Sequence, residues 1–338
     1  MTTQKNRRWL LAERPTGEIN DKQFTWVEEE IPSIADGELL VRVLYLSCDP
    51  TQRGWISRDT YLPVVKIGEV VRSGGVGRVI ASKNSQFVVG DLVSGLVGWQ
   101  DYAVMNGEGM FKPGKVPPDV PIPLAMSTFG LTGLTAYFGL LEIGRPKEGE
   151  TVLVSGAAGA TGSIVAQIAK IKGCHVVGIA GGKEKCDWLK NDVKVEAVID
   201  YKSENVAARV KELCPKGVDI FFDNVGGEQL DIALSRLAMN GRIVLCGAIS
   251  QYSDSTLPPG PKNYTNLIVK RGRMEGFLVS DHMAKAGTAI AELAGWVREG
   301  KIVDRVDIQK GLENAPRTLN RLFTGANVGK QLLLVADA

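Results

Sequence analysis

The run Thr151-Val-Leu-Val-Ser155, Gly156-Ala-Ala-Gly-Ala-Thr-Gly162, Ser163-Ile-Val-Ala-Gln-Ile-Ala-Lys-Ile-Lys-Gly173 decides the fold of this 338-residue chain. Its first five residues are mostly β-branched and apolar, which is typical of a short buried strand. Its last part places isoleucines on one helical face and ends at a glycine, as helices often do. A strand, a glycine-rich turn and a helix in this order predict a dinucleotide-binding cradle, because the helix N-terminus offers N–H groups to a pyrophosphate.

The turn itself departs from the pattern G-x-G-x-x-G, because Ala157 stands at the first glycine position. Gly159 lets the backbone approach the pyrophosphate, and Gly162 lets the helix pack closely on the strand. Such a turn alone is weak evidence. It gains weight here because a strand precedes it, a helix follows it, and His175–Ala180 reads as the next strand.

The end of that second strand indicates which dinucleotide is bound. An NAD site normally carries an acid there to hold the ribose 2′-hydroxyl, whereas this chain has Gly181-Gly-Lys-Glu-Lys185. The glycines leave room for a 2′-phosphate, and Lys183 or Lys185 can neutralise it, so we expect NADPH. The alternative is that both lysines lie on a solvated helix face. Glu184 weakens the prediction if it turns inward.

Strands and helices alternate after about residue 126, whereas short strands broken by glycine and proline turns fill the chain before it. We therefore expect an α/β protein: a compact β-barrel-type substrate domain over 1–125, completed by 305–338, and a doubly wound parallel sheet of Rossmann type over 126–304. Besides His175–Ala180, the strands expected in that sheet are Thr151–Ser155, Ala197–Asp200, Val218–Asp223 and Arg242–Cys246, with a helix at Glu228–Ala238 before the last of them.

Ligands bind at the carboxyl ends of the strands in such sheets. Asn224 follows the fourth strand, and the run Cys246-Gly-Ala-Ile-Ser-Gln-Tyr252 follows the fifth, so both are expected to line the crevice. Tyr201 follows the third strand, where its ring can cover the adenosine phosphate. On sequence alone, an ordinary surface tyrosine is the stronger interpretation of Tyr201.

Composition narrows the class of protein. Hydrophobic residues make up 44% and charged residues 23% of the chain, and the formal net charge is +2, so nothing favours nucleic acid or an anionic membrane as a partner. We see no run of about 18 apolar residues and no secretory signal, and the five scattered cysteines argue against a disulfide framework. A cytoplasmic enzyme is therefore expected.

The chain resembles the medium-chain dehydrogenase/reductase superfamily over essentially its whole length. Within it, the chain is similar to the zinc-independent NADPH-dependent alkenal/one reductases, the group of prostaglandin reductases, plant double-bond reductases and curcumin reductase. The stretches that carry the resemblance are Gly98-Trp-Gln-Asp-Tyr-Ala103, Thr128-Phe-Gly-Leu-Thr-Gly-Leu-Thr-Ala-Tyr137, Ala157-Ala-Gly-Ala-Thr-Gly162, Phe222-Asp-Asn-Val-Gly-Gly227, Cys246–Tyr252, Gly276-Phe-Leu-Val279 and Gly325-Ala-Asn-Val-Gly-Lys330.

The resemblance implies a GroES-like fold for the first domain and a homodimer formed through the nucleotide-binding domains. It also implies which residues contact NADP. These are Gly159, Ala160, Thr161, Gly162, Lys185, Tyr201, Asn224, Cys246, Gly247, Ala248, Ile249, Ser250, Tyr252, Phe277, Leu278, Val279 and Asn327. Gly181, at the end of the second strand, is expected to contact the cofactor as well.

Two positions depart from the pattern of the family. Many members carry a tyrosine where Thr51 stands, within Asp49-Pro-Thr-Gln-Arg53, and another where Val269 stands. Both changes affect the expected substrate pocket and leave the expected cofactor site intact. Arg53 can anchor its loop or contact an acidic substrate, and anchoring is the stronger interpretation.

No metal is expected. Zinc-dependent relatives need a cysteine and a Gly-His-Glu histidine, and although Cys48 stands near the cysteine position, Ile67-Gly68-Glu69 contains no histidine. We therefore expect Cys48 to be a small buried residue.

Without a metal, hydride addition is easier to a conjugated enone than to an isolated carbonyl, because it leaves an enolate that one hydrogen-bond donor can stabilise. We therefore expect an NADPH-dependent reductase that transfers hydride to the β-carbon of α,β-unsaturated ketones and aldehydes. Tyr252 and Tyr61 are the candidate catalytic residues, although either can instead serve as a wall or gap-filling side chain. A quinone oxidoreductase and a non-catalytic NADPH-binding protein remain alternatives.

Overall fold

The structure is a computed structural model and describes residues 5–106, 112–253 and 258–337. It divides into two units. The first comprises Met1–Met126, Val306–Asn327 and Gln331–Ala338, and the second comprises Ser127–Arg305 and Val328–Lys330.

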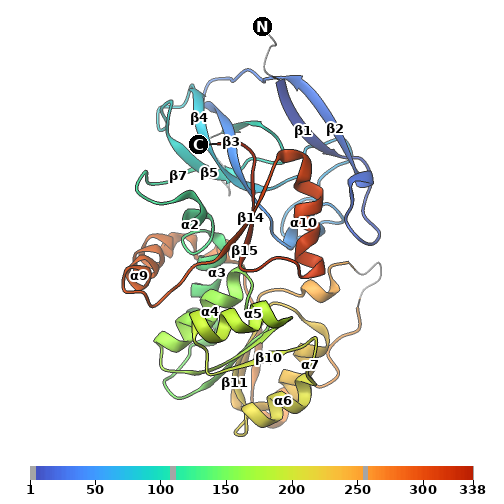
Figure 1. Cartoon of the computed structure of the whole chain (residues 1–338), viewed down its shortest axis with the longest axis vertical. Helices are drawn as coiled ribbons and strands as arrows, with labels where there is room; N and C mark the ends of the chain where they lie inside the picture. Colours follow the sequence, from blue (N-terminus) through green and yellow to red (C-terminus); the bar gives the residue numbers. More distant parts are fainter. Residues whose placement is uncertain (1–4, 107–111, 254–257, 338) are drawn as a thin grey trace. The chain divides into compact units, whose positions relative to one another are not determined.

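The first unit is built on a seven-stranded sheet in the order β14-β15-β3-β4-β5-β7, with β6 also paired to β3. Its strands are β3 (Glu38–Ser47), β4 (Gly74–Ser82), β5 (Leu92–Leu96), β6 (Tyr102–Asn106), β7 (Gly114–Lys115), β14 (Val306–Lys310) and β15 (Lys330–Leu334). A separate antiparallel hairpin joins β1 (Lys5–Leu11) to β2 (Phe24–Glu30) (Figure 1). The last segment of the chain therefore completes the first sheet.

The central strand β3 explains why this sheet forms. It pairs with β4, β6 and β15, and most of its residues are buried, which matches its nearly continuous apolar sequence. The paired strands approach closely at Gly77, where a Cβ atom would lie 2.4 Å from the carbonyl oxygen of Arg42. Short helices lie between the strands, among them α1 (Thr51–Trp55), α2 (Ile122–Met126) and α10 (Ala315–Thr324).

The second unit is a six-stranded parallel sheet in the order β10-β9-β8-β11-β12-β13. Its strands are β8 (Thr151–Val154), β9 (His175–Ala180), β10 (Ala197–Asp200), β11 (Val218–Asp223), β12 (Leu237–Leu245) and β13 (Arg273–Gly276). Its longer helices are α3 (Leu131–Phe138), α4 (Ala160–Ile171), α5 (Lys183–Trp188), α6 (Val206–Leu213), α7 (Gly227–Ser235) and α9 (Ala286–Arg298). From β8, the chain adds β9 and β10 on one side and then β11, β12 and β13 on the other, which is the strand order of a Rossmann sheet.

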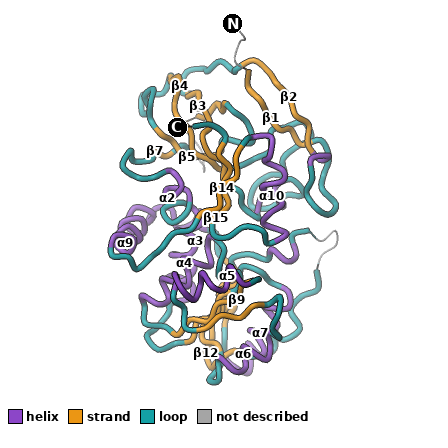
Figure 2. The backbone as a smooth tube through the Cα atoms, viewed as in Figure 1, coloured by secondary structure: helices purple, strands orange, loops and turns teal. Residues whose placement is uncertain are grey.

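Helices cover both faces of this sheet. One buried cluster joins α3, α4 and α5 to side chains such as Val152 and Phe222, and a second joins α6 and α7 to side chains such as Leu153 and Phe221. Figure 1 shows α6 and α7 together, apart from α4 and α5, and Figure 2 shows the strands in orange between purple helices. The predicted α/β fold, with a Rossmann sheet and a separate GroES-like β domain, is confirmed.

Two details of the prediction differ from the structure. The helix expected at Glu228–Ala238 ends at Ser235, and the following strand begins at Leu237 rather than Arg242. The run Leu237-Ala-Met is apolar enough to continue a helix, but Asn240 takes a left-handed conformation (φ 59°) inside the strand. The sheet also contains β13, a strand that was not predicted because its sequence is largely polar.

Candidate functional site: a nucleotide cradle at the strand ends

The glycine turn after β8 is tightly folded. Gly156 has φ +57°, and a Cβ atom at Gly162 would lie 2.3 Å from the Gly156 carbonyl oxygen and 2.9 Å from Cα of Ala157. Helix α4 begins directly after Gly159. Gly159 is in an extended conformation and has no side chain that could cap the first N–H groups of the helix. Ala160 and Thr161 therefore present backbone N–H groups at a helix N-terminus of the kind that binds phosphate.

A segment from the end of the chain lies against this turn. Gly329 forms an isolated parallel bridge with Gly159, and its N–H donates to the carbonyl oxygen of Ala158 (2.9 Å). Gly329 has φ +71°, and a Cβ atom there would lie 2.0 Å from the Arg305 carbonyl oxygen. The left-handed conformation and the close approach explain why the residue is a glycine.

The loop after β11 is fixed by the carboxylate of Asp223. Its Oδ1 atom accepts hydrogen bonds from the Ser155 hydroxyl (3.0 Å) and from the N–H groups of Val225 (3.0 Å) and Gly226 (2.9 Å). Asn224 donates from its N–H to the Ser155 hydroxyl (2.8 Å) and from Nδ2 to the Ser155 carbonyl (2.7 Å). These bonds join the loop after β11 to the end of β8.

Burial raises the pKa of the Asp223 carboxyl although three donors bond to the same oxygen. The residue is 1% exposed, and its Oδ2 atom has no hydrogen-bond partner among the described residues. Asp223 was not among the predicted site residues. The only sequence signal for it was its place just before Asn224, at the carboxyl end of a strand.

The loop after β12 is held by the same residues. Cys246 and Gly247 donate backbone N–H groups to the Asp223 carbonyl oxygen (2.9 and 3.0 Å), and Ile249 donates to the Asn224 carbonyl oxygen (3.3 Å). Cys246 is partly buried, and desolvation raises the pKa of its thiol to about 12, so it carries no thiolate at neutral pH.

Tyr252 points back into its own loop. Its phenol oxygen accepts a hydrogen bond from the Ala248 N–H (3.1 Å) and would lie 3.1 Å from a Cβ atom at Gly247. Ser250 donates its hydroxyl to the Val225 carbonyl oxygen (2.6 Å). The loops after β8, β11 and β12 therefore form one hydrogen-bonded rim at the carboxyl edge of the sheet.

The end of β9 meets the residue that follows β10. A Cβ atom at Gly181 would lie 2.6 Å from the ring of Tyr201, so the ring lies directly on the glycine. Tyr201 is half-exposed, which leaves part of the ring open to a ligand. The two predicted residues are thus brought together. Next to them, the Gly182 N–H donates to the carboxylate of Asp200 (2.8 Å).

Helix α5 carries the lysines proposed for the 2′-phosphate. Lys183 pairs with Asp187 one turn later and is largely exposed, whereas Lys185 lies on another side of the short helix. Glu184 does not turn toward the glycines: its Oε1 atom pairs with Nη2 of Arg305 (2.6 Å).

The segment 277–279 adjoins the same sheet edge, after β13. Phe277 packs on Gly139, the residue that follows α3, since a Cβ atom there would lie 2.4 Å from its ring, and Leu278 is partly exposed. Val279 begins a short 3-10 helix, η5 (Val279–Lys285). Asn327, the remaining predicted contact, is 8% exposed and belongs to the first unit.

Tyr61 lies in the first unit, in the loop after α1. A hydrogen bond of 3.0 Å joins its hydroxyl to that of Thr51, and its ring lies edge-on to Trp55 with centroids 6.2 Å apart. Partial burial raises the pKa of the Tyr61 phenol, so the phenol is protonated at neutral pH. Arg53 is buried and donates Nη2 to the Pro15 carbonyl oxygen (2.9 Å), which is the predicted anchoring role.

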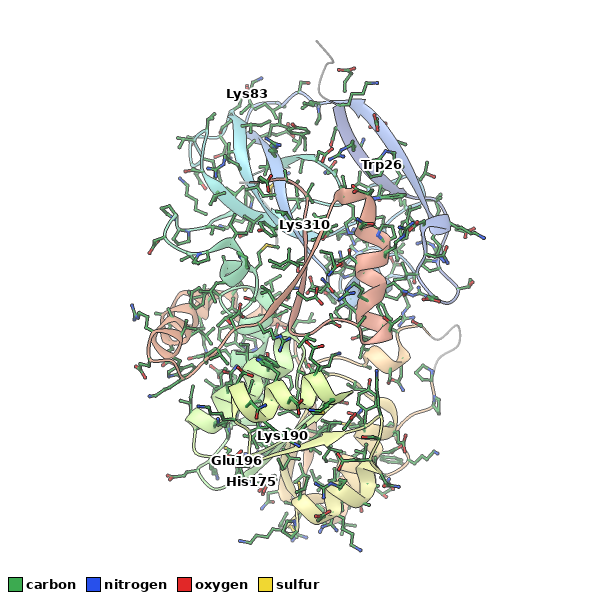
Figure 3. All side chains as sticks on the ribbon, in the orientation of Figure 1. Trp26, Lys83, His175, Lys190, Glu196 and Lys310 are labelled. Atoms are coloured by element: carbon green, nitrogen blue, oxygen red, sulfur yellow. The ribbon has the colours of Figure 1, made fainter. Side chains whose placement is uncertain are left out.

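No group of three or more His, Cys, Asp or Glu side chains gathers as a metal site among the described residues. Cys48 is buried in the core of the first unit. His175 stands at the amino end of β9, the edge opposite the glycine turn, and the N–H of the next residue, Val176, donates to Oε2 of Glu196 (2.8 Å). Figure 3 labels His175 and Glu196. His282 stacks on Phe138 with centroids 5.0 Å apart. No described helix is long and apolar enough to cross a membrane.

The residues at the sheet edge fit a dinucleotide. The turn at Gly156–Gly162 has no room for a Cβ atom at Gly162, and it leads into the N-terminus of α4. The ring of Tyr201 lies beside Gly181, where the adenosine of a dinucleotide is expected. The fold and the site together define a dinucleotide-dependent oxidoreductase.

Comparisons with known proteins narrow this class. The family models "N-terminal domain of oxidoreductase" and "Zinc-binding dehydrogenase" match residues 7–112 and 160–294. The chain is 41% identical to NADPH-dependent curcumin reductase of Escherichia coli, with 98% of both chains covered, and 41% identical to the NADP(+)-dependent 2-alkenal reductase of Nicotiana tabacum, also with 98% of both covered. A crystal structure of CurA from Vibrio vulnificus in complex with NADPH matches with a TM-score of 0.92 and 42% identity, over 98% of this chain and 100% of that one. The chain belongs to the zinc-independent alkenal/one reductases of the medium-chain dehydrogenase/reductase superfamily, as predicted.

Proposed function

We propose that the protein is an NADPH-dependent reductase of the carbon–carbon double bond in α,β-unsaturated ketones and aldehydes. The observation that carries the proposal is the full-length similarity, at about 40% identity, to relatives named as curcumin and 2-alkenal reductases. The hydrogen-bonded rim of glycine loops at the carboxyl edge of the Rossmann sheet supports it. In this proposal the second unit binds the cofactor, and the first unit, which contains nearly all of the substrate domain expected at 1–125 and 305–338, carries substrate-binding residues.

NADPH supplies a hydride when bound. The residues that would hold it are those of the rim: the α4 N-terminus at Gly159–Gly162 for the pyrophosphate, Lys185 and Tyr201 for the adenosine phosphate, and Asn224 with the 246–252 loop for the nicotinamide ribose. The segment 277–279 and Asn327 would complete the contacts.

Two tyrosines are proposed to act on the substrate. Tyr252 would donate a hydrogen bond to the carbonyl oxygen, where the negative charge of the enolate develops. Its phenol oxygen accepts the Ala248 N–H (3.1 Å), which holds the phenol at the loop that lines the nicotinamide ribose in this proposal. Tyr61, whose phenol stays protonated, would be a second donor or the proton source for the α-carbon.

A substrate panel tests the proposal. Purified protein is mixed with NADPH, and in parallel with NADH, and with an enone, a quinone or a saturated aldehyde, while the cofactor absorbance is followed. We expect oxidation of NADPH with the enone, faster than with the quinone, and none with the aldehyde. Turnover of the quinone alone would instead indicate a quinone oxidoreductase, and no turnover of any acceptor would indicate a binding protein.

We also infer a homodimer formed through the second unit. Strand β13 is an edge of its sheet, paired only with β12 within the described chain, and such an edge is open to another strand. The neighbouring short helix α8 (Asn266–Lys270) exposes apolar side chains: Ile268 is 76% and Val269 is 62% exposed. A second copy of the chain could pair with the open strand edge and bury these exposed apolar side chains. A cytoplasmic location is proposed as well, supported by the odd number and the scattered positions of the five cysteines.

A further inference from the structure

Arg305 reaches the cofactor-selecting segment from far along the chain. Its Nη2 atom lies 2.6 Å from Oε1 of Glu184, and 121 positions separate the two residues. Glu184 is in the first turn of α5, directly before Lys185, so its charge stands close to where a 2′-phosphate would be neutralised. A carboxylate near the end of the second strand is the feature that normally favours NAD and opposes NADP.

The other carboxylates of this region already have partners from nearby positions. Asp187 pairs with Lys183 one helical turn away, and Asp200 accepts the N–H groups of Gly182 (2.8 Å) and Lys202 (3.0 Å). For Glu184 the ion-pair partner in the structure is Arg305. The charge of Glu184 is therefore neutralised by tertiary structure rather than by its own helix.

Arg305 is held in place by more than this ion pair. Its guanidinium lies 5.6 Å from the ring centre of the buried Trp188, which follows Glu184 by four residues and so shares its helical face. Its carbonyl oxygen accepts the N–H of Lys330 (2.9 Å), next to the Gly329 that bonds to the glycine turn. Arg305 is thus positioned beside α5 by its backbone and by an aromatic ring.

We infer that Arg305 is a specificity-determining residue for NADPH: it holds and neutralises Glu184, which would otherwise repel the 2′-phosphate. Without Arg305 the charge of Glu184 is no longer compensated by an ion pair, and it repels a phosphate bound near the first turn of α5. The inference rests on the proposed use of NADPH, and nucleotide binding tests it without turnover.

The experiment is a calorimetric titration of the full-length protein with adenosine 2′,5′-bisphosphate and with adenosine 5′-monophosphate, which differ by the 2′-phosphate alone. In Arg305→Met we expect the affinity for the bisphosphate to fall about three- to sixfold, the size of one partly exposed charge interaction, with the monophosphate unchanged. Adding Glu184→Gln to this variant should restore bisphosphate affinity to within about twofold of the wild type.

Arg317→Met is the matched control. Arg317 pairs through Nη2 with Asp21 at the same distance as the Arg305–Glu184 pair (2.6 Å), and both Arg317 and Asp21 belong to the first unit, so the control removes an arginine–carboxylate pair outside the nucleotide-binding unit. It should change neither affinity.

Three results would overturn the inference: no loss of bisphosphate affinity in Arg305→Met, an equal loss for both nucleotides, or a loss that Glu184→Gln does not restore. The last result would indicate that Arg305 contacts the 2′-phosphate directly instead of acting through Glu184. If the wild type itself does not prefer the bisphosphate, the proposed cofactor fails, and that result is distinct from a failure of Arg305.

Discussion

At the scale of single residues, the site is organised around the Asp223–Asn224 pair. Asp223 and Asn224 hold the ends of β8, β11 and β12 together through backbone and side-chain hydrogen bonds. The sequence predicted Asn224 as a ligand contact because it follows a strand. It did not predict that Asp223 supports the rim, since the Ser155 partner lies 68 positions away.

Replacing Tyr252 by phenylalanine should lower turnover of an enone roughly tenfold or more, because the proposed donor to the carbonyl oxygen is lost. The affinity for NADPH, measured by fluorescence titration, should stay nearly unchanged. Tyr137→Phe is the control, since it removes a phenol that bonds to Glu292 (2.9 Å) in the same unit. If Tyr252→Phe turns over the enone as fast as the control does, Tyr252 is not the hydrogen-bond donor to the carbonyl oxygen.

The stability of the protein should depend on the charge of Asp223. Burial raises the pKa of this carboxyl above the value of 3.8 for an ordinary Asp, so the folded state holds the proton more tightly than the unfolded state. The contribution of this group to stability therefore increases as the pH falls through the raised pKa, and it is complete below the unfolded value. The variant Asp223→Asn has no carboxyl at this position, so its stability lacks this pH-dependent contribution.

Urea unfolding of the wild type and of Asp223→Asn at a series of pH values measures the effect. We expect the difference in free energy of unfolding to move in favour of the wild type as the pH falls from neutral. A difference independent of pH would show that burial does not shift the carboxyl as the structure indicates.

At the scale of elements, the glycine turn and α4 depend on one close contact. A Cβ atom at Gly162 would lie 2.3 Å from a backbone oxygen, and a backbone atom cannot move aside as a side chain can. Gly162→Ala should therefore cost about 2 kcal/mol of stability by overpacking and weaken NADPH binding about tenfold or more.

Gly287→Ala is the matched control for this substitution. Gly287 lies in α9 with no atom within 4 Å of its Cβ position, so alanine there should keep or raise stability through its higher helix propensity. The midpoint of thermal unfolding and NADPH titration check both variants. Wild-type binding by Gly162→Ala would contradict the assignment of this turn to the pyrophosphate.

Elements with strong local patterns were predictable, and others were not. The strands His175–Ala180, Ala197–Asp200 and Val218–Asp223 were predicted with the bounds they have, because each is a short apolar run between turn residues. Strand β13 was missed because Arg273-Met-Glu-Gly276 is largely polar, and only pairing with β12 makes it a strand. The Arg305–Glu184 pair depends on tertiary structure and leaves no local signal.

At the scale of the whole molecule, the proposed homodimer can be tested at the exposed face of α8. Ile268→Asp places a charge on this face and should raise the dimer dissociation constant about tenfold or more, because a buried unpaired charge opposes association. Light scattering after size-exclusion chromatography measures the mass. Val89→Asp, at an exposed apolar residue of the first unit, is the control and should leave the mass unchanged. A monomeric wild type would contradict the proposal.

The enone arm of the substrate panel, run with an isotopic label, tests the central claim most directly. NADPH carrying deuterium at the transferable position of the nicotinamide is incubated with the protein and a straight-chain enone, and the product is identified by nuclear magnetic resonance. The account predicts a saturated ketone with deuterium on the former β-carbon. An allylic alcohol with deuterium on the former carbonyl carbon would contradict it.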